Sequence, residues 1–363
     1  MNRKIKLFGF FILLTFGQTT FAQTNKETAL QKAKEAIKLE DEAGKYDEAI
    51  TLFDEAQKLD PENINYPYEM AYAYSGKKEY KKASDILEKL LNHKDVHGRV
   101  YQALGNAYDE QGKAEKAMET YEKGVKKFPN SGELYLEMGN MKINKKEYEK
   151  ALPFYEKGIE VDPKFPSNYY WASKLFCSST EEVWGMIYGE IFMNLERNSK
   201  RTAEISKLLF DTYKSEIKFT SDTSYSVSFS KNASMNVEDL KDPKKIKLPF
   251  GMGCYEMVLM LAVLSDQQID INSLDRIRTR FVDGYFKGDN SKDYPNLLFD
   301  YQQKIKTAGH LEAYNHWILM KGDEDGFDKW KANNETKWND FTKWFTDNKL
   351  QVDRTNKFYR EQY

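Results

Sequence analysis

The sequence predicts an all-α fold, with an array of helix pairs in the N-terminal half and a mainly helical C-terminal domain that carries a small β-hairpin. Three observations lead to this prediction. Alanines at positions 49, 83, 117 and 151 follow one another at intervals of 34 residues. Within each interval, apolar or small residues recur at the spacing i, i+3, i+4 and i+7, which places them on one face of a helix. Strict alternation of apolar and polar residues, typical of a strand, is clear only between residues 224 and 230.

The clearest repeat runs from Arg99 to Pro129. It contains two short amphipathic segments, whose apolar or small residues are Tyr101, Leu104, Gly105, Tyr108, Ala117 and Tyr121. Gly105 lies where the two helices of the pair must approach closely. A repeat of this length with these residue types resembles the tetratricopeptide repeat (TPR) family. The resemblance covers about residues 30–163, in four repeats.

The resemblance implies a right-handed superhelix in which the first helix of each repeat lines a concave groove. The positions of this chain that match the groove are Asn65, Tyr68, Tyr72, Arg99, Gln102, Asn106, Asp109, Glu133, Leu136 and Asn140. It further implies a non-enzymatic adaptor or scaffold that needs no cofactor and binds a protein or peptide. Asp109 and Glu133 occupy the surface where some family members carry lysines for acidic peptide ends, so the sequence does not favour an acidic ligand.

The N-terminus has the three parts of a signal peptide. Arg3, Lys4 and Lys6 are basic, residues 7–17 are apolar, and Thr20-Phe21-Ala22 is a cleavage sequence. The apolar run is shorter than the roughly 20 residues that span a bilayer. We therefore predict an exported protein, periplasmic or extracellular and soluble, with no membrane insertion after the signal is removed.

The predicted domains are the signal peptide (1–22), four repeats (27–165), a degenerate fifth repeat (166–198) and a helical C-terminal domain (199–363) with its hairpin near residues 217–230. The near-balanced net charge of −2 does not favour nucleic-acid binding. Cys177 and Cys254 are the only cysteines, and the sequence leaves open whether they form a disulfide. The oligomeric state is also open.

The C-terminal domain resembles no family, so its elements are predicted from pattern alone. We expect helices over residues 201–214, 271–286, 294–306, 310–320 and 327–350, a turn at 222–223, a polar loop over 231–247 and a chain break at 249–253. Residues 255–264 are nearly all apolar, which predicts a helix at the centre of a C-terminal core. Glu256 within it should have a basic partner or lie at the helix start.

Several patterns that could carry chemistry have a simpler structural interpretation. His93 and His97 have a zinc-ligand spacing, but they lie where a turn is required. The serines from Ser224 to Ser230 should all point to solvent from one strand, and no Gly-x-Ser-x-Gly motif accompanies them. Gly251-Met252-Gly253 lacks the following Gly-Lys-Ser/Thr of a phosphate loop. The sequence thus predicts no catalytic residue and no metal site.

Two alternative functions remain open at this stage. The aromatic stripe of Phe327, Trp330, Trp338, Phe341 and Phe345 has the spacing of a helix core, yet it could form a glycan-stacking platform in the cell envelope. A glycan binder should expose Trp330 or Trp338, whereas an adaptor should bury them. A hydrolase would instead need titratable side chains that converge in a C-terminal cleft.

Overall fold

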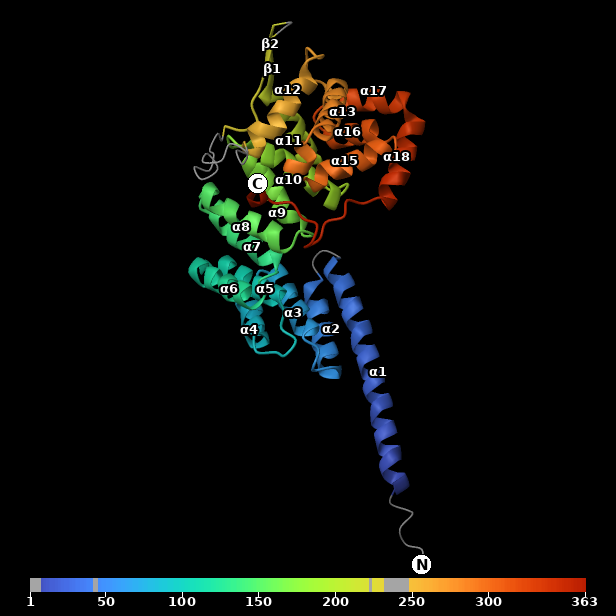
Figure 1. Ribbon diagram of the computed structural model, residues 1–363. Coiled ribbons are helices and arrows are strands. Elements are labelled where there is room, and N and C mark those ends of the chain that lie inside the picture. Colours follow the sequence, from blue (N-terminus) through green and yellow to red (C-terminus); the bar gives the residue numbers. More distant parts are fainter. Residues whose placement is uncertain (1–7, 42–44, 222–223, 232–247) are drawn as a thin grey trace, which may run out of the picture. The chain divides into compact units, whose positions relative to one another are not determined.

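The computed structural model describes residues 8–41, 45–221, 224–231 and 248–363, with only the backbone described for residues 8–22. The chain divides into two compact units, Met1–Met141 and Lys142–Tyr363. Helices dominate both units (Figure 1). The described residues contain one β-sheet, which has two antiparallel strands. The predicted all-α fold with a small hairpin is confirmed.

Unit 1 consists of consecutive helices, each of which runs antiparallel to the next (Figure 1). They are α1 (Phe8–Asp41), α2 (Tyr46–Leu59), α3 (Asn65–Gly76), α4 (Tyr80–Leu90), α5 (Gly98–Glu110), α6 (Ala114–Lys127) and α7 (Gly132–Asn144), whose last three residues belong to unit 2. From α1 to α6, each helix packs against the next along the chain. This is the helix-pair arrangement that the 34-residue period predicts.

The repeated alanines explain that period. Ala49, Ala83 and Ala117 are completely buried where neighbouring helices meet. At Gly105 a Cβ atom would overlap the ring of Tyr121, so the contact between α5 and α6 requires glycine. Small residues recur every 34 positions because each repeat makes the same close helix contact.

The N-terminal helix α1 continues without a break through the predicted cleavage site after Ala22. Its later part packs on α2 through Ala29, Ala33 and Ala36, which belong to one buried cluster with Phe53. The basic residues at positions 3, 4 and 6 lie outside the described residues. Within the part of the chain that the structure describes, no helix is both long enough and apolar enough to cross a membrane.

Unit 2 contains the remaining helices and the hairpin. In chain order these are α8 (Tyr148–Val161), α9 (Pro166–Phe176), α10 (Glu182–Leu195), α11 (Lys200–Glu216), β1 (Ile217–Ser221), β2 (Ser224–Val227), the π-helical turn η2 (Gly251–Glu256), α12 (Met257–Val263), α13 (Ile271–Lys287), α14 (Asn290–Asp293), α15 (Leu297–Thr307), α16 (Leu311–Leu319), α17 (Glu324–Asn333), α18 (Glu335–Asp347) and the short 3-10 helix η3 (Arg360–Gln362).

The centre of unit 2 is α10, which is buried on every side from Glu182 to Asn194. It packs against α9, α11 and α15. At Gly185 a Cβ atom would lie 2.5 Å from Cys177 Sγ, so a small residue is required where α9 and α10 meet. The prediction that residues 255–264 form the centre of the core is therefore wrong: α12 lies at the surface, with Leu261 and Leu264 exposed.

Three further sequence predictions need correction. The glycines at 251 and 253 do not break the chain, because both lie in the π-helical turn that leads into α12. The predicted helix over 327–350 is two helices, α17 and α18, separated at Asn334. The serines do not all face solvent, because Ser230 lies beyond β2, is buried, and donates a hydrogen bond to Glu181. The expected turn at 222–223 and nearly all of the loop at 231–247 lie outside the described residues.

The C-terminal tail after α18 packs back onto the first helices of unit 2. Phe358 is buried against Trp184 and Tyr188 of α10. Arg360 forms two hydrogen bonds to the buried carboxylate of Glu156 in α8, at 2.9 and 2.7 Å. The end of the chain is thus an integral part of the core of unit 2.

Candidate partner-binding site

The predicted groove residues of α3 differ in their surroundings. Tyr72 is 60% exposed, and Asn65 is also exposed. Tyr68 is only 7% exposed, because its ring packs edge-to-face on His97 and lies under the guanidinium of Arg99 at 5.4 Å. Tyr68 therefore contributes to packing between α3 and α5, while Tyr72 is available to a ligand.

The groove residues of α5 mostly have partners within unit 1. Asn106 accepts a hydrogen bond from the hydroxyl of Tyr121 at 2.5 Å. Gln102 donates to Glu137 of α7 at 2.8 Å. Arg99 remains exposed beside Tyr68, and Asp109 is half-buried. The amides of this face are thus held in place by the repeat framework.

On α7 the acidic side chain of Glu137 connects two predicted groove residues. It accepts hydrogen bonds from Gln102 and, at 3.1 Å, from Asn140. Glu133 accepts a hydrogen bond from Ser131 at 3.0 Å, and Leu136 is half-buried. Glu137 was missed by the sequence reasoning, although it lies four residues after Glu133 and hence on the same helical face.

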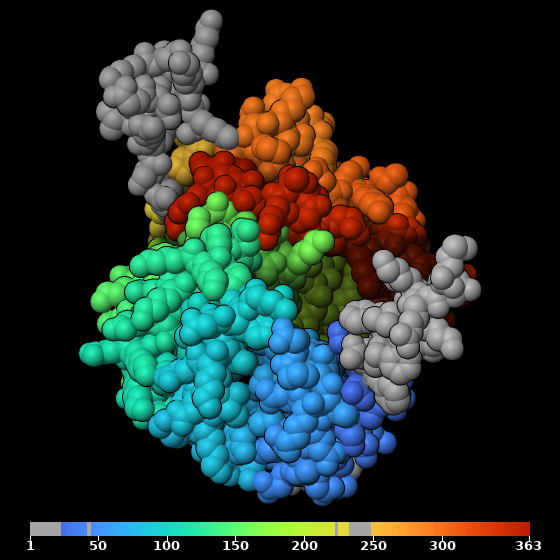
Figure 2. Space-filling view, turned by 90° about the horizontal axis from the view of Figure 1, so that it is seen from below, coloured from blue at the N-terminus to red at the C-terminus, as the bar shows by residue number. Residues whose placement is uncertain are grey.

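Carboxyl groups lie near the aromatic end of this face. Burial raises the pKa of Glu69 on α3, and the charge of Arg99 opposes this increase. Burial, together with the nearby charges of Glu69 and Asp41, raises the pKa of Glu40 to about 7. One carboxyl oxygen of Glu40 is buried without a hydrogen-bond partner. The protonation of Glu40 therefore changes near neutral pH. In Figure 2 the helices that carry this face are coloured light blue (α3), cyan (α5) and blue-green (α7).

Unit 2 has a separate apolar pocket of about 650 Å³ beside α8 and α9. Its lining residues are Ile143, Tyr148, Glu149, Leu152, Trp171, Lys174, Leu175, Ser178, Ser179 and Thr180. One ring in this wall, Trp171, is stacked on Tyr155 with a centroid separation of 6.2 Å. The volume lies in the range of small-molecule sites, and the apolar lining suits a bulky apolar group.

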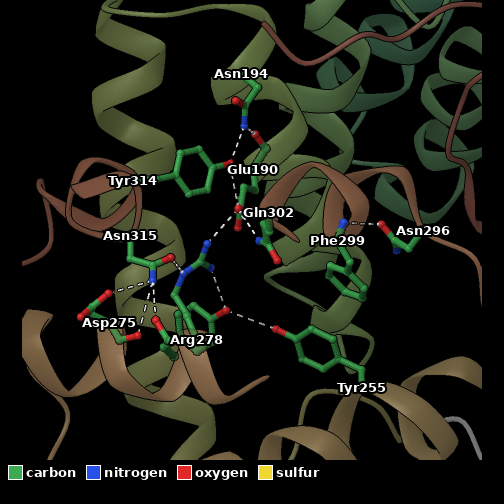
Figure 3. Close-up of polar contacts among 12 residues, drawn as sticks. Glu190, Asn194, Tyr255, Asp275, Arg278, Asn296, Phe299, Gln302, Tyr314 and Asn315 are labelled. Atoms are coloured by element: carbon green, nitrogen blue, oxygen red, sulfur yellow. Dashed lines mark hydrogen bonds and ion pairs between the residues drawn. The ribbon is translucent and has the colours of Figure 1, made fainter. Parts of the chain in front are cut away.

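The interior of unit 2 contains a polar network centred on Glu190 of α10 and Arg278 of α13 (Figure 3). Arg278 donates to Glu190 Oε1 at 2.8 Å. The same oxygen accepts hydrogen bonds from Gln302 at 2.6 Å and from the hydroxyl of Tyr314 at 2.9 Å. Arg278 also donates to Asn315 at 2.8 Å. Burial acts to lower the pKa of Arg278, but Glu190 together with Tyr213 and Tyr314 outweighs it and raises this pKa well above its usual range.

A small cavity adjoins this network. Its volume is about 20 Å³, and its polar lining includes Glu190, Tyr255 and Gln302. Such a volume holds about one water molecule. The cavity is too small for a substrate. We therefore interpret the network as a structural link between α10, α13, α15 and α16.

The remaining candidates for chemistry have structural roles. His97 packs on Tyr68, and His93 Nδ1 accepts a hydrogen bond from the backbone of Asp95 in the predicted turn. In the described ranges, no group of three or more His, Cys, Asp or Glu residues is arranged to hold a metal ion. Cys177 and Cys254 do not form a disulfide in this structure, which answers the question that the sequence left open.

Glu256 lies at the start of α12, which is one of the two alternatives predicted for it, and its hydrogen-bond partners are backbone groups. It accepts hydrogen bonds from the backbone N–H groups of Phe229 and Ser230, rather than from a lysine or arginine. Burial raises the pKa of Glu256, and these two backbone donors oppose the increase.

The aromatic stripe is a core, as its spacing predicts. Trp330 is buried and stacks on His316 with a centroid separation of 4.0 Å. Trp338 is half-buried against Phe327 and Trp330. These contacts leave no open aromatic platform at Trp330.

Comparison with known proteins places the repeats in a family. Three models described as tetratricopeptide repeat match residues 42–107, 98–141 and 132–165. No curated protein matches the chain. Solved structures that are similar include a thermophilic TPR protein of Thermus thermophilus, with 17% identity, a TM-score of 0.41 and coverage of 50% of this chain and 98% of the other.

Two further solved structures are similar at the same level. PilF of Pseudomonas aeruginosa is 18% identical, with a TM-score of 0.43 and coverage of 53% of this chain and 86% of the other. YrrB, described as a TPR protein with an unusual peptide-binding site, is 21% identical, with a TM-score of 0.32 and coverage of 50% and 94%. The three family models together confirm the predicted resemblance: residues 42–165 consist of tetratricopeptide repeats. This match supports the interpretation of the region as a protein-interaction scaffold.

Proposed function

We propose that this protein is an exported, non-enzymatic scaffold that holds a partner protein on the first-helix face of its repeats. We define this face by the ten residues predicted above on α3, α5 and α7. The observation that carries the proposal is Tyr72, a large aromatic side chain that the framework of unit 1 leaves 60% exposed. Tyrosine is a frequent anchor of protein interfaces, since it combines a large apolar area with a hydroxyl group.

The neighbours of Tyr72 indicate the kind of partner. Arg99 is exposed beside the buried Tyr68, so a cation and an aromatic ring lie next to each other. Gln102 and Asn140 are both oriented by Glu137. The face thus offers aromatic surface, amides and charges of both signs. Such a surface suits an extended peptide or a helix with a mixed sequence.

Export is proposed from the N-terminal sequence. Its basic residues, apolar run and Thr20-Phe21-Ala22 sequence match a secretory signal. The partner would then be another protein of the cell envelope or of the medium. Neither nucleic acid nor a catalytic reaction is part of this proposal.

Partner capture with matched variants tests the proposal. The processed chain is immobilised, envelope extract is passed over it, and the retained protein is identified and purified for titration. Truncation of Tyr72 to Ala should leave the melting temperature nearly unchanged and weaken binding of that protein by about 1–3 kcal/mol, as expected for an interface anchor. Unchanged affinity in the folded Tyr72→Ala variant would refute the proposal.

Two further variants separate the possible surfaces. Glu122→Ala changes an exposed residue of α6 outside the face and should not affect binding. Tyr148→Ala removes an exposed ring from the rim of the unit 2 pocket. Loss of binding in Tyr148→Ala, with full binding in Tyr72→Ala, would place the partner in that pocket instead.

A further inference from the structure

The surface of unit 2 carries an apolar face that the fold does not use. It consists of Leu248, Met252, Met257, Met260, Leu261 and Leu264, on η2, α12 and the residues next to them. We call these six residues the α12 face. Leu261 is 70% exposed, Leu264 61% and Met257 55%. Apolar residues are common singly on protein surfaces, but a contiguous group of this size is often functional.

The α12 face is held rigidly from behind. The opposite side of α12 is buried through Val258, Leu259 and Val263. The Tyr225 hydroxyl of the hairpin donates to the carbonyl of Met260 at 2.9 Å, and Arg280 of α13 donates to the carbonyl of Ala262 at 2.6 Å. The exposed apolar side chains therefore belong to a fixed helix, so no ordering of the backbone opposes their binding.

The α12 face carries no charge. Within residues 248–264, all of which the structure describes, Glu256 is the single charged residue. Its carboxylate is directed at the backbone N–H groups of Phe229 and Ser230, on the hairpin side of the helix. The exposed side of the helix is thus formed by methionine and leucine alone.

We infer that the α12 face binds the same face of a second copy of this chain, so that the protein forms a two-fold symmetric dimer. A two-fold interface brings the same surface patch of both copies together, and a charged residue near the axis would meet the like charge of its own symmetry mate. The uncharged α12 face satisfies this condition. Methionine side chains are flexible and polarisable, which helps a face to pack against itself.

The exposed area agrees with a dimer of modest affinity. Six half-exposed leucine and methionine side chains present on the order of 600 Å², comparable with the largest patch of a typical monomer. A standard protein interface buries about 800 Å² on each partner. A dimer would also present two first-helix faces, so a partner with repeated binding motifs would gain avidity.

Sedimentation equilibrium of the full chain in its native processed form tests this inference. The wild type should change from monomer to dimer as its concentration rises through the micromolar range. Leu261→Asp places a carboxylate on the α12 face of each copy and should raise the dimer dissociation constant at least tenfold, because burial of these charges in the interface is costly. Since Leu261 is 70% exposed, the melting temperature should stay the same. Leu30→Asp, at a 50% exposed leucine of α1, is the matched control and should dimerise as the wild type does.

A mixture of charge variants tests the geometry directly. Leu261→Lys alone should dimerise poorly, but an equimolar mixture with Leu261→Asp should form a heterodimer, because the two copies then bring opposite charges into one interface. A wild type that stays monomeric to about 100 μM, or a Leu261→Asp variant that dimerises like the wild type, would overturn the inference. Vesicles of phosphatidylglycerol and phosphatidylcholine provide the last arm: a monomeric wild type that binds them, with binding lost in Leu261→Asp, would assign the α12 face to a lipid surface instead.

Discussion

Arg278 and Glu190 form an ion pair at 2.8 Å inside unit 2, where both side chains are at most 6% exposed. They are 88 residues apart in the sequence and lie on α13 and α10. Each has further hydrogen bonds, to Asn315, Gln302 and Tyr314. A buried charge is tolerated only when it is paired and hydrogen-bonded, so this pair links the central helix of unit 2 to its C-terminal helices.

Removal of one partner of this pair should strongly destabilise unit 2. Arg278→Met leaves Glu190 buried without its counter-charge, and Glu190→Gln does the same to Arg278. We expect either variant to lower the free energy of unfolding by about 3–5 kcal/mol. Chemical denaturation measures this change. The double variant should lose less than the sum of the two single losses, whereas additive losses would show that the two residues do not interact.

The close contact at Gly105 should not tolerate a side chain. In Gly105→Ala the new methyl group overlaps the Tyr121 ring, and overpacking typically costs about 1–3 kcal/mol. This cost should exceed the roughly 1 kcal/mol that alanine gains over glycine in a helix. Thermal melting of the repeats provides the measurement. Gly288→Ala is the control, because a Cβ atom there has no neighbour within 4 Å, and its melting temperature should not fall. A Gly105→Ala variant as stable as the wild type would contradict the proposed contact.

Glu40 should make the stability of unit 1 depend on pH. Its pKa is about 7 in the folded state and 4.5 in the unfolded chain, so the folded state binds more protons between these values. Stability should therefore fall as the pH rises from about 4.5 to about 7. Glu40→Gln removes this contribution and should be more stable than the wild type at pH 8 but not at pH 4.5. Urea unfolding at both pH values measures the difference. Glu35→Gln, at an exposed residue of α1, should show no such pH-dependent gain.

The C-terminal tail should be required for a stable unit 2. Phe358 is 1% exposed, and replacement of a buried phenylalanine by alanine typically costs about 3–5 kcal/mol. We expect Phe358→Ala to lower the free energy of unfolding by that amount. Glu361→Ala changes an exposed residue of the same tail and should have little effect. Equal stability of the two variants would mean that the tail is not part of the core.

The N-terminal sequence predicts that the mature chain begins at Gln23. Terminal sequencing of the protein isolated from the envelope or the medium measures this directly. Ala22→Arg places a large charged residue at the position that signal peptidase recognises and should block processing. Retention of Met1 in the wild type would contradict the prediction of a cleaved signal.

Local periodicity explains which parts of the fold could be predicted. The repeats were found because every unit uses the same small residues, such as Ala83 and Ala117, for the same contact between neighbouring helices. The C-terminal helices beginning at Ile271 and near Leu311 were likewise predicted, since their apolar residues recur at helical spacing. Helical spacing also predicts which residues lie on the first-helix face. It does not predict that Tyr72 is exposed and Tyr68 buried, because contacts with His97 and Arg99 of the next repeat decide this.

By itself, the sequence determined the helical class, the repeat period and the presence of the hairpin, because each depends on contacts between residues close in the chain. Tertiary structure alone decided which helix became the centre of unit 2. Both α10 and α12 are apolar, but α10 is enclosed by other helices, whereas α12 has neighbours on one side only. It also decided that Glu190 pairs with Arg278, since a pairing across 88 residues leaves no periodic trace in the sequence.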